Sequence, residues 1–274
     1  MNGPVNSASV TARVDWVRRK IVVMAKIAPG IRVASSLSAV EVLCALYYGD
    51  LVDFDATDPH WNDRDRVILS KGHGSIAMYP ILADLGFLDM QELDHVGHDQ
   101  SRLTVIPEPT APGIETTNGS LGHGLGVACG IAIGLRQRQK DQTVFVLCGD
   151  GEMNAGPIWE AVMFAAHHAL DNIVLIVDDN KRSMLGDQVD IMGLAPLAEK
   201  FSAFGWQAIE MDGHDLGAVQ GNLQRLKVER LGAPKVVISH TVKGRGVPEL
   251  ENDPISHVRV LSGEAIERIL KQMP

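Results

Sequence analysis

The sequence predicts an α/β protein with a doubly wound, mostly parallel sheet and helices on both faces. TVFVLC (143–148) and IVLIVDDN (173–180) are uninterrupted apolar runs, typical of strands buried on both faces. Between them, PIWEAVMFAAHHAL (157–170) is predicted to be a helix. A strand, a helix and a second strand in this order indicate a parallel βαβ unit with a right-handed crossover.

The N-terminal third is predicted to be mainly helical. Residues near 7–27 alternate apolar and basic positions at helical spacing, and Pro29-Gly30 ends that helix. Ser38 is expected to cap a second helix, AVEVLCALYYG (39–49). A short strand, RVILS (66–70), then leads into KGHGS and a helix that ends near Gly86.

The rest of the chain continues the alternation of helices and strands. Residues 97–118 predict a long loop, and loops of this length are usually functional. GSLGHGLGVACGIAIGLRQRQ predicts a glycine-studded helix whose small residues permit close backbone approach. WQAIEM, DLGAVQGNLQRLKVERL and KVVISH repeat the strand–helix–strand pattern, and GEAIERILKQM forms a last helix. No linker is visible, so residues 1–274 are predicted to form a single domain.

Composition excludes several classes of function. A net charge of −9 argues against a nucleic-acid partner, so a phosphate-bearing ligand must be held by local groups or a metal. Cys44, Cys129 and Cys148 lie in apolar surroundings and are expected to be reduced core residues. The N-terminus shows no apolar signal core, and no apolar stretch is long enough to span a membrane. We therefore expect a cytoplasmic protein without membrane contact.

Two polar residues follow the two clearest strands. Asp150 and Asn180 come at the carboxyl ends of these strands, where open parallel sheets bind ligands. Two oxygen ligands so placed suit a hard cation such as Mg²⁺ that shares a phosphate, and Gly151 lets the backbone approach that phosphate. Asp-Gly alone is equally a common turn or helix cap. The pairing with Asn180 favours the metal site.

These segments resemble a known family. GDGEMNAGPIWEA followed by LDNIVLIVDDN resembles the thiamine-diphosphate signature in its transketolase version. SSLSAVEVL, DRVILSKGHGS, PGIETTNGSLGHGLG, GWQAIEMDGHD and HTVKGRGV match further transketolase segments in order, from about residue 10 to 260. The pyrimidine-binding and C-terminal domains of a full-length transketolase have no match here. The chain therefore resembles the N-terminal, diphosphate-binding subunit of a split transketolase.

The resemblance implies roles for individual residues, and it implies thiamine diphosphate with Mg²⁺ (or Ca²⁺ or Mn²⁺) as cofactors. It places a metal on Asp150, Asn180 and the backbone carbonyl of Arg182. A neutral His73 would hydrogen-bond the diphosphate or substrate oxygens. The residues implied to contact the cofactor are Ser35, His73, Gly119, Ser120, Leu121, Gly151, Glu160, Asn180, Lys243 and His257. The residues implied in catalysis are His73, His257, Glu160 and Arg32.

Three positions depart from the family pattern. Arg32 stands where the family has a catalytic histidine, and an arginine stays charged and so cannot shuttle protons at neutral pH. It is instead suited to clamp a carboxylate or phosphate. Ile106 replaces a histidine that contacts donor hydroxyls, and Ala155 replaces a glutamate of a network linking two active sites. Transfer between ordinary pentose phosphates is therefore in question.

Three functions follow from this pattern. The leading one is transfer of a two-carbon unit from a ketose or 2-oxo donor to an aldehyde acceptor. The second is a decarboxylating thiamine enzyme with a 2-oxoacid donor, which Arg32 and Ile106 would suit. The third is a non-catalytic partner chain, against which the metal pair and His73 argue. The implied partner is a C-terminal transketolase subunit with the pyrimidine-binding domain, in a heterotetramer with two copies of each.

Overall fold

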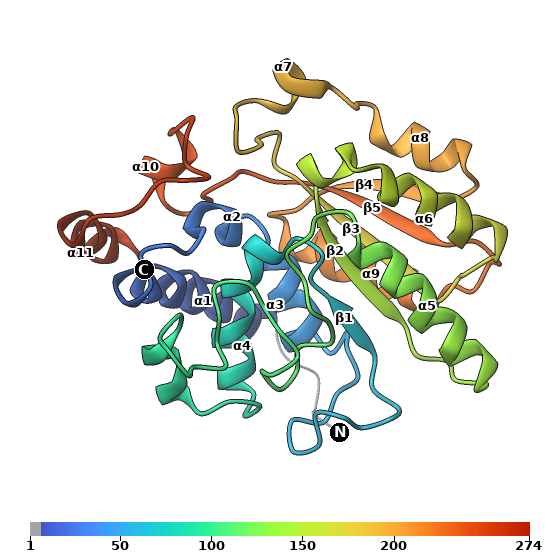
Figure 1. Ribbon diagram of the computed structural model, residues 1–274, viewed down its shortest axis with the longest axis horizontal. Helices are drawn as coiled ribbons and strands as arrows, with labels where there is room; N and C mark the ends of the chain where they lie inside the picture. Colours follow the sequence, from blue (N-terminus) through green and yellow to red (C-terminus); the bar gives the residue numbers. More distant parts are fainter. Residues whose placement is uncertain (1–6) are drawn as a thin grey trace.

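One parallel sheet organises the chain. The computed structural model describes residues 7–274, so the first six residues of the predicted domain lie outside the described part. Every neighbouring pair of strands in the five-stranded sheet is parallel, which confirms the predicted fold class (Figure 1). In spatial order the strands are β1 (Arg66–Ile68), β2 (Val144–Gly149), β3 (Ile173–Asp179), β5 (Lys235–His240) and β4 (Gln207–Asp212).

Helices cover both faces of the sheet, and each face has its own hydrophobic core (Figure 1). The division is visible along β2, where Phe145 and Leu147 face one core while Val144, Val146 and Cys148 face the other. The helices over the first face are α1 (Ser7–Ile27), α3 (Val40–Tyr48), α4 (Met78–Asp84) and α9 (Leu216–Val228). Those over the second are α5 (Gly124–Gln137), α6 (Gly156–His167) and α8 (Leu197–Ala203).

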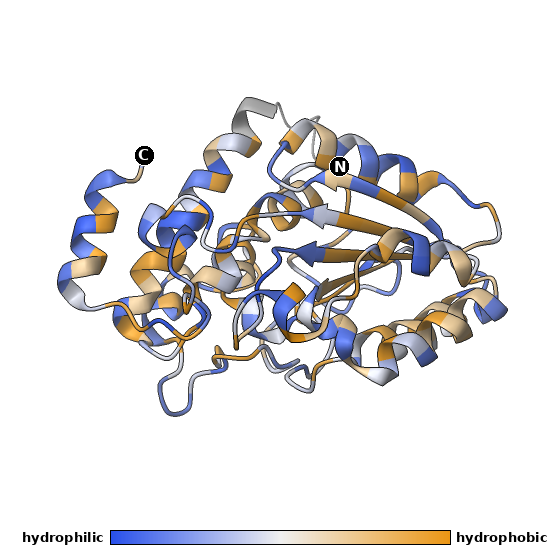
Figure 2. Cartoon of the chain, turned by 90° about the horizontal axis from the view of Figure 1, so that it is seen from above, coloured by the Kyte–Doolittle hydropathy of each residue, from blue (hydrophilic) through white to orange (hydrophobic). Residues whose placement is uncertain are grey.

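The strands change character along their length. Their bodies are hydrophobic and several of their carboxyl ends are hydrophilic, as the colour change near the arrowheads in Figure 2 shows. In β3 this change falls between Val177 and the Asp178-Asp179 pair. Polar side chains therefore gather at one edge of the sheet, where the loops that follow the strands begin.

The remaining helices contain ten residues or fewer. They are α2 (Val33–Leu37), η1 (Gly72–Ala77), η2 (Met90–His95), η3 (Gly151–Asn154), α7 (Gln188–Met192), α10 (Pro248–Glu251) and α11 (Gly263–Gln272).

The expected role of Ser38 as the cap of the following helix is wrong. Ala39, not Ser38, occupies the N-cap position of α3. The buried Ser38 hydroxyl instead donates a hydrogen bond to the Asp178 carboxylate. A hydrogen bond to a charged acceptor is stronger than the neutral bond that a helix cap would form with a backbone amide.

Other local predictions hold in part. Residues 97–118 lie outside regular helices and strands, and the three cysteines are free and buried. Close approach by the glycine-rich helix occurs at Gly124, where a Cβ would lie 2.4 Å from the Ser70 side chain. Gly126, Gly130 and Gly134 have open space instead. Within residues 7–274, no helix has the length and apolar character needed to cross a bilayer.

The central strand should tolerate truncation poorly. Ile176 in β3 is fully buried, so Ile176→Ala should lower the free energy of unfolding by roughly 2–5 kcal/mol through lost burial and a cavity. Urea unfolding followed by circular dichroism measures this change. Val228→Ala at the exposed end of α9 serves as a control and should change stability by less than about 0.5 kcal/mol. Equal effects of the two variants would contradict the assignment of β3 to the core.

Candidate cofactor site

A cavity opens where the two central strands end. Asp150 directly follows β2 and Asn180 directly follows β3, and the Asp150 N–H donates to the carbonyl of Asp178 at 3.2 Å. The volume of the cavity is about 340 Å³. Most of the residues predicted to contact a metal or cofactor line it together: His73, Gly119, Leu121, Asp150, Gly151, Asn180, Arg182, Lys243 and His257.

The Asp150 carboxylate is only half satisfied. Its Oδ1 accepts from the Gly151 N–H at 2.8 Å, whereas its buried Oδ2 has no hydrogen-bond partner among residues 7–274. Burial, and after it the nearby Asp178 carboxylate, raises the pKa of Asp150 to about 6. A buried carboxylate oxygen without a donor requires a cation or a proton.

The neighbouring oxygens complete a donor set for a hard cation. The Asn180 side-chain oxygen accepts only from the Arg182 N–H, at 3.2 Å, among the contacts within the described chain. The Arg182 carbonyl accepts from the Lys243 ammonium at 2.8 Å. One carboxylate, one carboxamide and one backbone carbonyl form the oxygen set that Mg²⁺ accepts when phosphate oxygens and water supply the rest. These residues therefore fit a metal-bound diphosphate.

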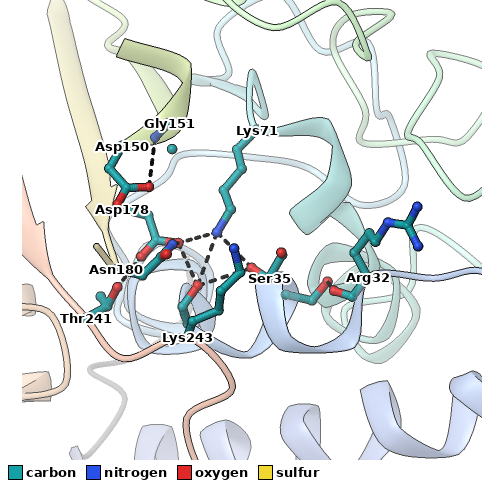
Figure 3. A network of polar contacts seen from close by, with 12 residues as sticks. Arg32, Ser35, Lys71, Asp150, Gly151, Asp178, Asn180, Thr241 and Lys243 are labelled. Carbon is teal, nitrogen blue, oxygen red and sulfur yellow. Dashed lines mark hydrogen bonds and ion pairs between the residues drawn. The ribbon is translucent and has the colours of Figure 1, made fainter. Parts of the chain in front are cut away.

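A buried ion pair supports this edge of the cavity, and we did not predict it from the sequence. The Lys71 ammonium pairs with Asp178, and it donates to the Ser35 carbonyl at 2.8 Å and to the Ser38 hydroxyl at 3.1 Å (Figure 3). Burial pushes the pKa of Asp178 upward, but the Lys71 charge and its hydrogen-bond donors outweigh it and hold that pKa below its usual value. Lys71 belongs to the KGHGS segment. A lysine directly after an apolar strand is the sequence feature that could have indicated a buried ion pair here.

Two neutral imidazoles face the same cavity. The rings of His73 and His257 lie with centroids 5.0 Å apart. Burial and then the Lys71 charge lower the pKa of His73 to about 2, while burial and then Lys243 lower that of His257 to about 4. Lys243 donates to His257 Nδ1 at 2.9 Å, so the proton of this ring sits on Nε2. These lowered pKa values favour the neutral form of both rings at pH 7.

Lys243 places an ammonium group with a lowered pKa in the cavity wall. Burial, and after it the Lys71 charge, lowers the pKa of Lys243 to about 8. The segment before it is held by His214, which contacts Glu41 through Nδ1 at 2.9 Å and accepts from the Val242 N–H at 2.8 Å. These contacts give His214 a structural role, in which it holds the loop after β5 that carries Lys243.

Glu152 links the glycine-rich loop (residues 119–122) to the turn formed by Asp150 and Gly151, which we call the metal turn. We did not predict this role from the sequence either. This buried carboxylate accepts from the Gly122 N–H at 2.8 Å, from the Gly149 N–H at 3.2 Å and from the Ser70 hydroxyl. One side chain therefore joins β2, the loop after β1 and the start of α5. This arrangement sets the distance of Gly119 and Leu121 from Gly151 across the cavity.

Four predicted residues lie off the cavity wall. Ser35 is fully buried behind it, with its Oγ 3.4 Å from His257 Nδ1, and Ser120 lines a small neighbouring hollow. Glu160 is exposed on α6, away from the cavity. The Arg32 guanidinium points away from the Lys71 network, and it forms no ion pair or hydrogen bond within the described range (Figure 3). Its charge contributes, after burial and the two lysines, to the lowered pKa of His257.

Two departures from the family pattern are small apolar contacts. Ile106 lines the cavity, and its Cγ2 would lie 3.2 Å from a Cβ on Gly72. Ala155 packs against Gly122, where an added Cβ would come within 2.7 Å of the Ala155 methyl group. Of these two residues, Ile106 adds an apolar side chain to the cavity wall, whereas Ala155 is not among the residues that line the cavity.

The fold and the cavity define an α/β domain whose strand ends carry oxygen donors that fit a metal-bound diphosphate. The chain matches the family described as "Transketolase, thiamine diphosphate binding domain" over residues 24–273. It belongs to the transketolase family, and the predicted transketolase-type N-terminal subunit is confirmed.

Relatives and solved structures agree with this placement. The chain is 38% identical over 259 residues to one of the subunits of apulose-4-phosphate transketolase from Actinobacillus succinogenes, covering 94% of this chain and 93% of that one. It is 37% identical over 240 residues to 6-deoxy-6-sulfo-D-fructose transketolase subunit SqwG of a Clostridium species, with coverages of 85% and 84%. The crystal structure of Campylobacter jejuni transketolase superposes with a TM-score of 0.90 at 28% identity, over 96% of this chain but only 42% of that chain.

Asp150→Asn should separate stability from cofactor binding. The unfolded chain ionises Asp150 near its ordinary pKa of 3.8 and the folded chain only near 6, so at pH 7 the folded protein carries an unfavourable charge. Asparagine keeps the hydrogen bond to Gly151 without that charge. The variant without ligands should therefore be more stable at pH 7 by roughly 1–3 kcal/mol, a gain that fades as the pH falls towards 4.

Urea unfolding at several pH values measures that gain, and calorimetry measures binding. The same variant should lose metal-dependent binding of thiamine diphosphate. A variant that is less stable at pH 7 and binds as tightly as the wild type would refute the description of Asp150.

Lys71→Met should destabilise the fold by more than the change in side-chain volume alone would cause. The change leaves Asp178 buried without its cation, which should cost about 3–5 kcal/mol. Adding Asp178→Asn should recover a large part of the loss, because the unpaired charge is then removed. Thermal unfolding of the two single variants and the double variant closes the cycle; strictly additive losses would mean that the two side chains are not coupled.

Proposed function

We propose that this chain is the diphosphate-binding subunit of a two-subunit, Mg²⁺- and thiamine-diphosphate-dependent transketolase, which transfers a two-carbon unit to an aldehyde acceptor. The observation that carries this proposal is the unpartnered Asp150 oxygen in a cavity that also contains the Lys71 and Lys243 ammonium groups and two neutral imidazoles. The other carboxylate that lines the cavity, Glu152, already accepts three hydrogen bonds. Such a wall is complementary to a metal ion with a diphosphate.

The residues present define a division of labour. Asp150, Asn180 and the Arg182 carbonyl would hold the metal. Lys243 and the neutral ring of His73 would bind diphosphate or substrate oxygens. When bound, thiamine diphosphate supplies the electron sink that lets a carbon–carbon bond next to a carbonyl break and form. His257, whose Nε2 carries the proton of the neutral ring, is placed to donate a hydrogen bond to a substrate oxygen.

Exposed apolar side chains support the need for a partner. Leu121, Met184 and Leu185 line the cavity and are 43%, 54% and 78% exposed. Val127 on α5 and the pair Met163 and Phe164 on α6 are also exposed. Two relatives are named as transketolase subunits. We infer a C-terminal partner subunit that carries the pyrimidine-binding domain. The two chains would form a cytoplasmic heterotetramer with two copies of each. Glu160, exposed on α6, would act at the interface between the two subunits.

The cavity wall bears on the identity of the donor. Ile106 offers no hydrogen bond to a donor hydroxyl, and Arg32 adds positive charge beside His257. Both features favour a donor with fewer hydroxyl groups near the reacting carbon and an anionic group elsewhere. A 2-oxoacid donor, as in decarboxylating thiamine enzymes, is therefore the second candidate. A non-catalytic role is disfavoured, because a chain without cofactor gains nothing from an uncompensated buried carboxylate.

A donor assay distinguishes these functions. The purified chain alone should show no turnover, whereas the complex reconstituted with its partner should transfer a two-carbon unit from hydroxypyruvate. It should turn over xylulose 5-phosphate with ribose 5-phosphate more slowly than an ordinary transketolase does. Turnover of pyruvate with release of carbon dioxide would establish the second candidate, and inactivity with every donor would establish a non-catalytic role.

The same complex tests Arg32. Arg32→Ala should raise the KM for an anionic substrate roughly fivefold, the effect of a partly solvated charge worth ~1 kcal/mol. Arg138→Ala, at the exposed end of α5, is the matched control and should leave KM unchanged. Full transketolase rates with pentose phosphates, unaffected by Arg32→Ala, would overturn this interpretation of Arg32.

A further inference from the structure

A second cavity adjoins the metal turn. Its volume is about 600 Å³, and it shares Asp150 and Arg182 with the cofactor cavity. Gln188, the first residue of α7, lines this second cavity. Its carboxamide is buried, and neither Oε1 nor Nε2 has a hydrogen-bond partner in the part of the chain that the structure describes. A buried amide left in this state costs about 1–3 kcal/mol, so it indicates a group yet to be bound.

The backbone holds Gln188 against the proposed metal ligands. Its N–H donates to the Lys181 carbonyl at 2.8 Å. The next pair of residues in this turn, Arg182 and Asp187, forms an isolated antiparallel β-bridge. An ion pair between Arg182 Nε and Asp187 Oδ1, at 3.4 Å, adds to the bridge. The chain therefore leaves Asn180, turns back within a few residues and returns Gln188 to a place across from the Asn180–Arg182 segment.

The side chain of Gln188 also reaches the other half of the site. A Cβ built on Gly151 would lie 3.8 Å from Gln188 Oε1, which is van der Waals contact. Gly151 follows Asp150, which lines the same cavity as Gln188 and whose Oδ2 is another buried oxygen without a partner in the described chain. Two unpartnered polar groups, carried by different loops and lining one cavity, point to a single bound group that satisfies both.

We propose that Gln188 is a further residue of the metal site, and that its carboxamide binds a water of the hydrated divalent cation held by Asp150, Asn180 and the Arg182 carbonyl. The inference rests on the proposed function. Mg²⁺ retains several of its waters when it binds to proteins, and their protein partners orient the shell. Gln188 Oε1 is an acceptor for such a water, and the loss of an outer-shell partner of this kind typically weakens metal binding roughly 10–100-fold.

Metal titration in the presence of saturating thiamine diphosphate tests Gln188. Calorimetry should show that Gln188→Leu and Gln188→Ala bind Mg²⁺ at least about tenfold more weakly than the wild type, and that Gln188→Glu, which keeps an acceptor, recovers most of the affinity. The melting temperature of the ligand-free Gln188→Leu variant should equal or exceed that of the wild type, because an unsatisfied amide has been removed without adding a charge.

The matched control is Gln142→Leu. Gln142 also has a buried, unpartnered Oε1 among residues 7–274, but it precedes β2 at the opposite end of the sheet. Its replacement should leave Mg²⁺ affinity unchanged. Wild-type affinity in both Gln188→Leu and Gln188→Ala would overturn the role of Gln188 alone. A wild-type chain that binds thiamine diphosphate without any dependence on metal would overturn the metal site itself.

Discussion

The buried ion pair between Lys71 and Asp178 is the contact on which the site depends. It joins the loop after β1 to the end of β3, and through Ser35 and Ser38 it also holds the segment from α2 to α3. Two charges taken out of water remain buried only while each satisfies the other. The pair therefore fixes the relative position of three segments that are far apart in the sequence, and the cavity forms between them.

This pair also determines the electrostatics of the cavity. Asp178 is neutralised by Lys71, which leaves Asp150 as the carboxylate without compensation at the end of β2. The burial that raises the pKa of Asp150 lowers those of His73 and His257, so the imidazoles stay neutral beside two lysines. A site with one free carboxylate, neutral donors and ammonium groups can hold a cation and a polyanion together, and it disfavours either one alone.

Much of the fold, and the placement of Asp150 and Asn180 at neighbouring strand ends, could be predicted because both follow from local patterns. Apolar runs identify β2 and β3, and parallel strands must end at the same edge, which brings Asp150 and Asn180 together. Lys71, Asp178 and Glu152 were overlooked because their roles depend on which segments become neighbours, and no local pattern reports that. Ser38 was assigned to a helix cap for the same reason, since its acceptor lies in a strand 140 positions away. Glu160 is exposed on α6, and the Arg32 guanidinium turns away from the Lys71 network; no local sequence pattern reports either orientation.

The cavity and the exposed apolar side chains around it fit the proposed arrangement, in which this chain would bind the diphosphate end of the cofactor and a partner would bind the other end. The central claim is the metal site, and anomalous diffraction from crystals grown with Mn²⁺ and thiamine diphosphate tests it most directly. We predict one strong peak within about 2.0–2.3 Å of Asp150 Oδ2, Asn180 Oδ1 and the Arg182 carbonyl oxygen. A peak bound by other residues, or none at this edge of the sheet when the cofactor is visible, would contradict the metal site.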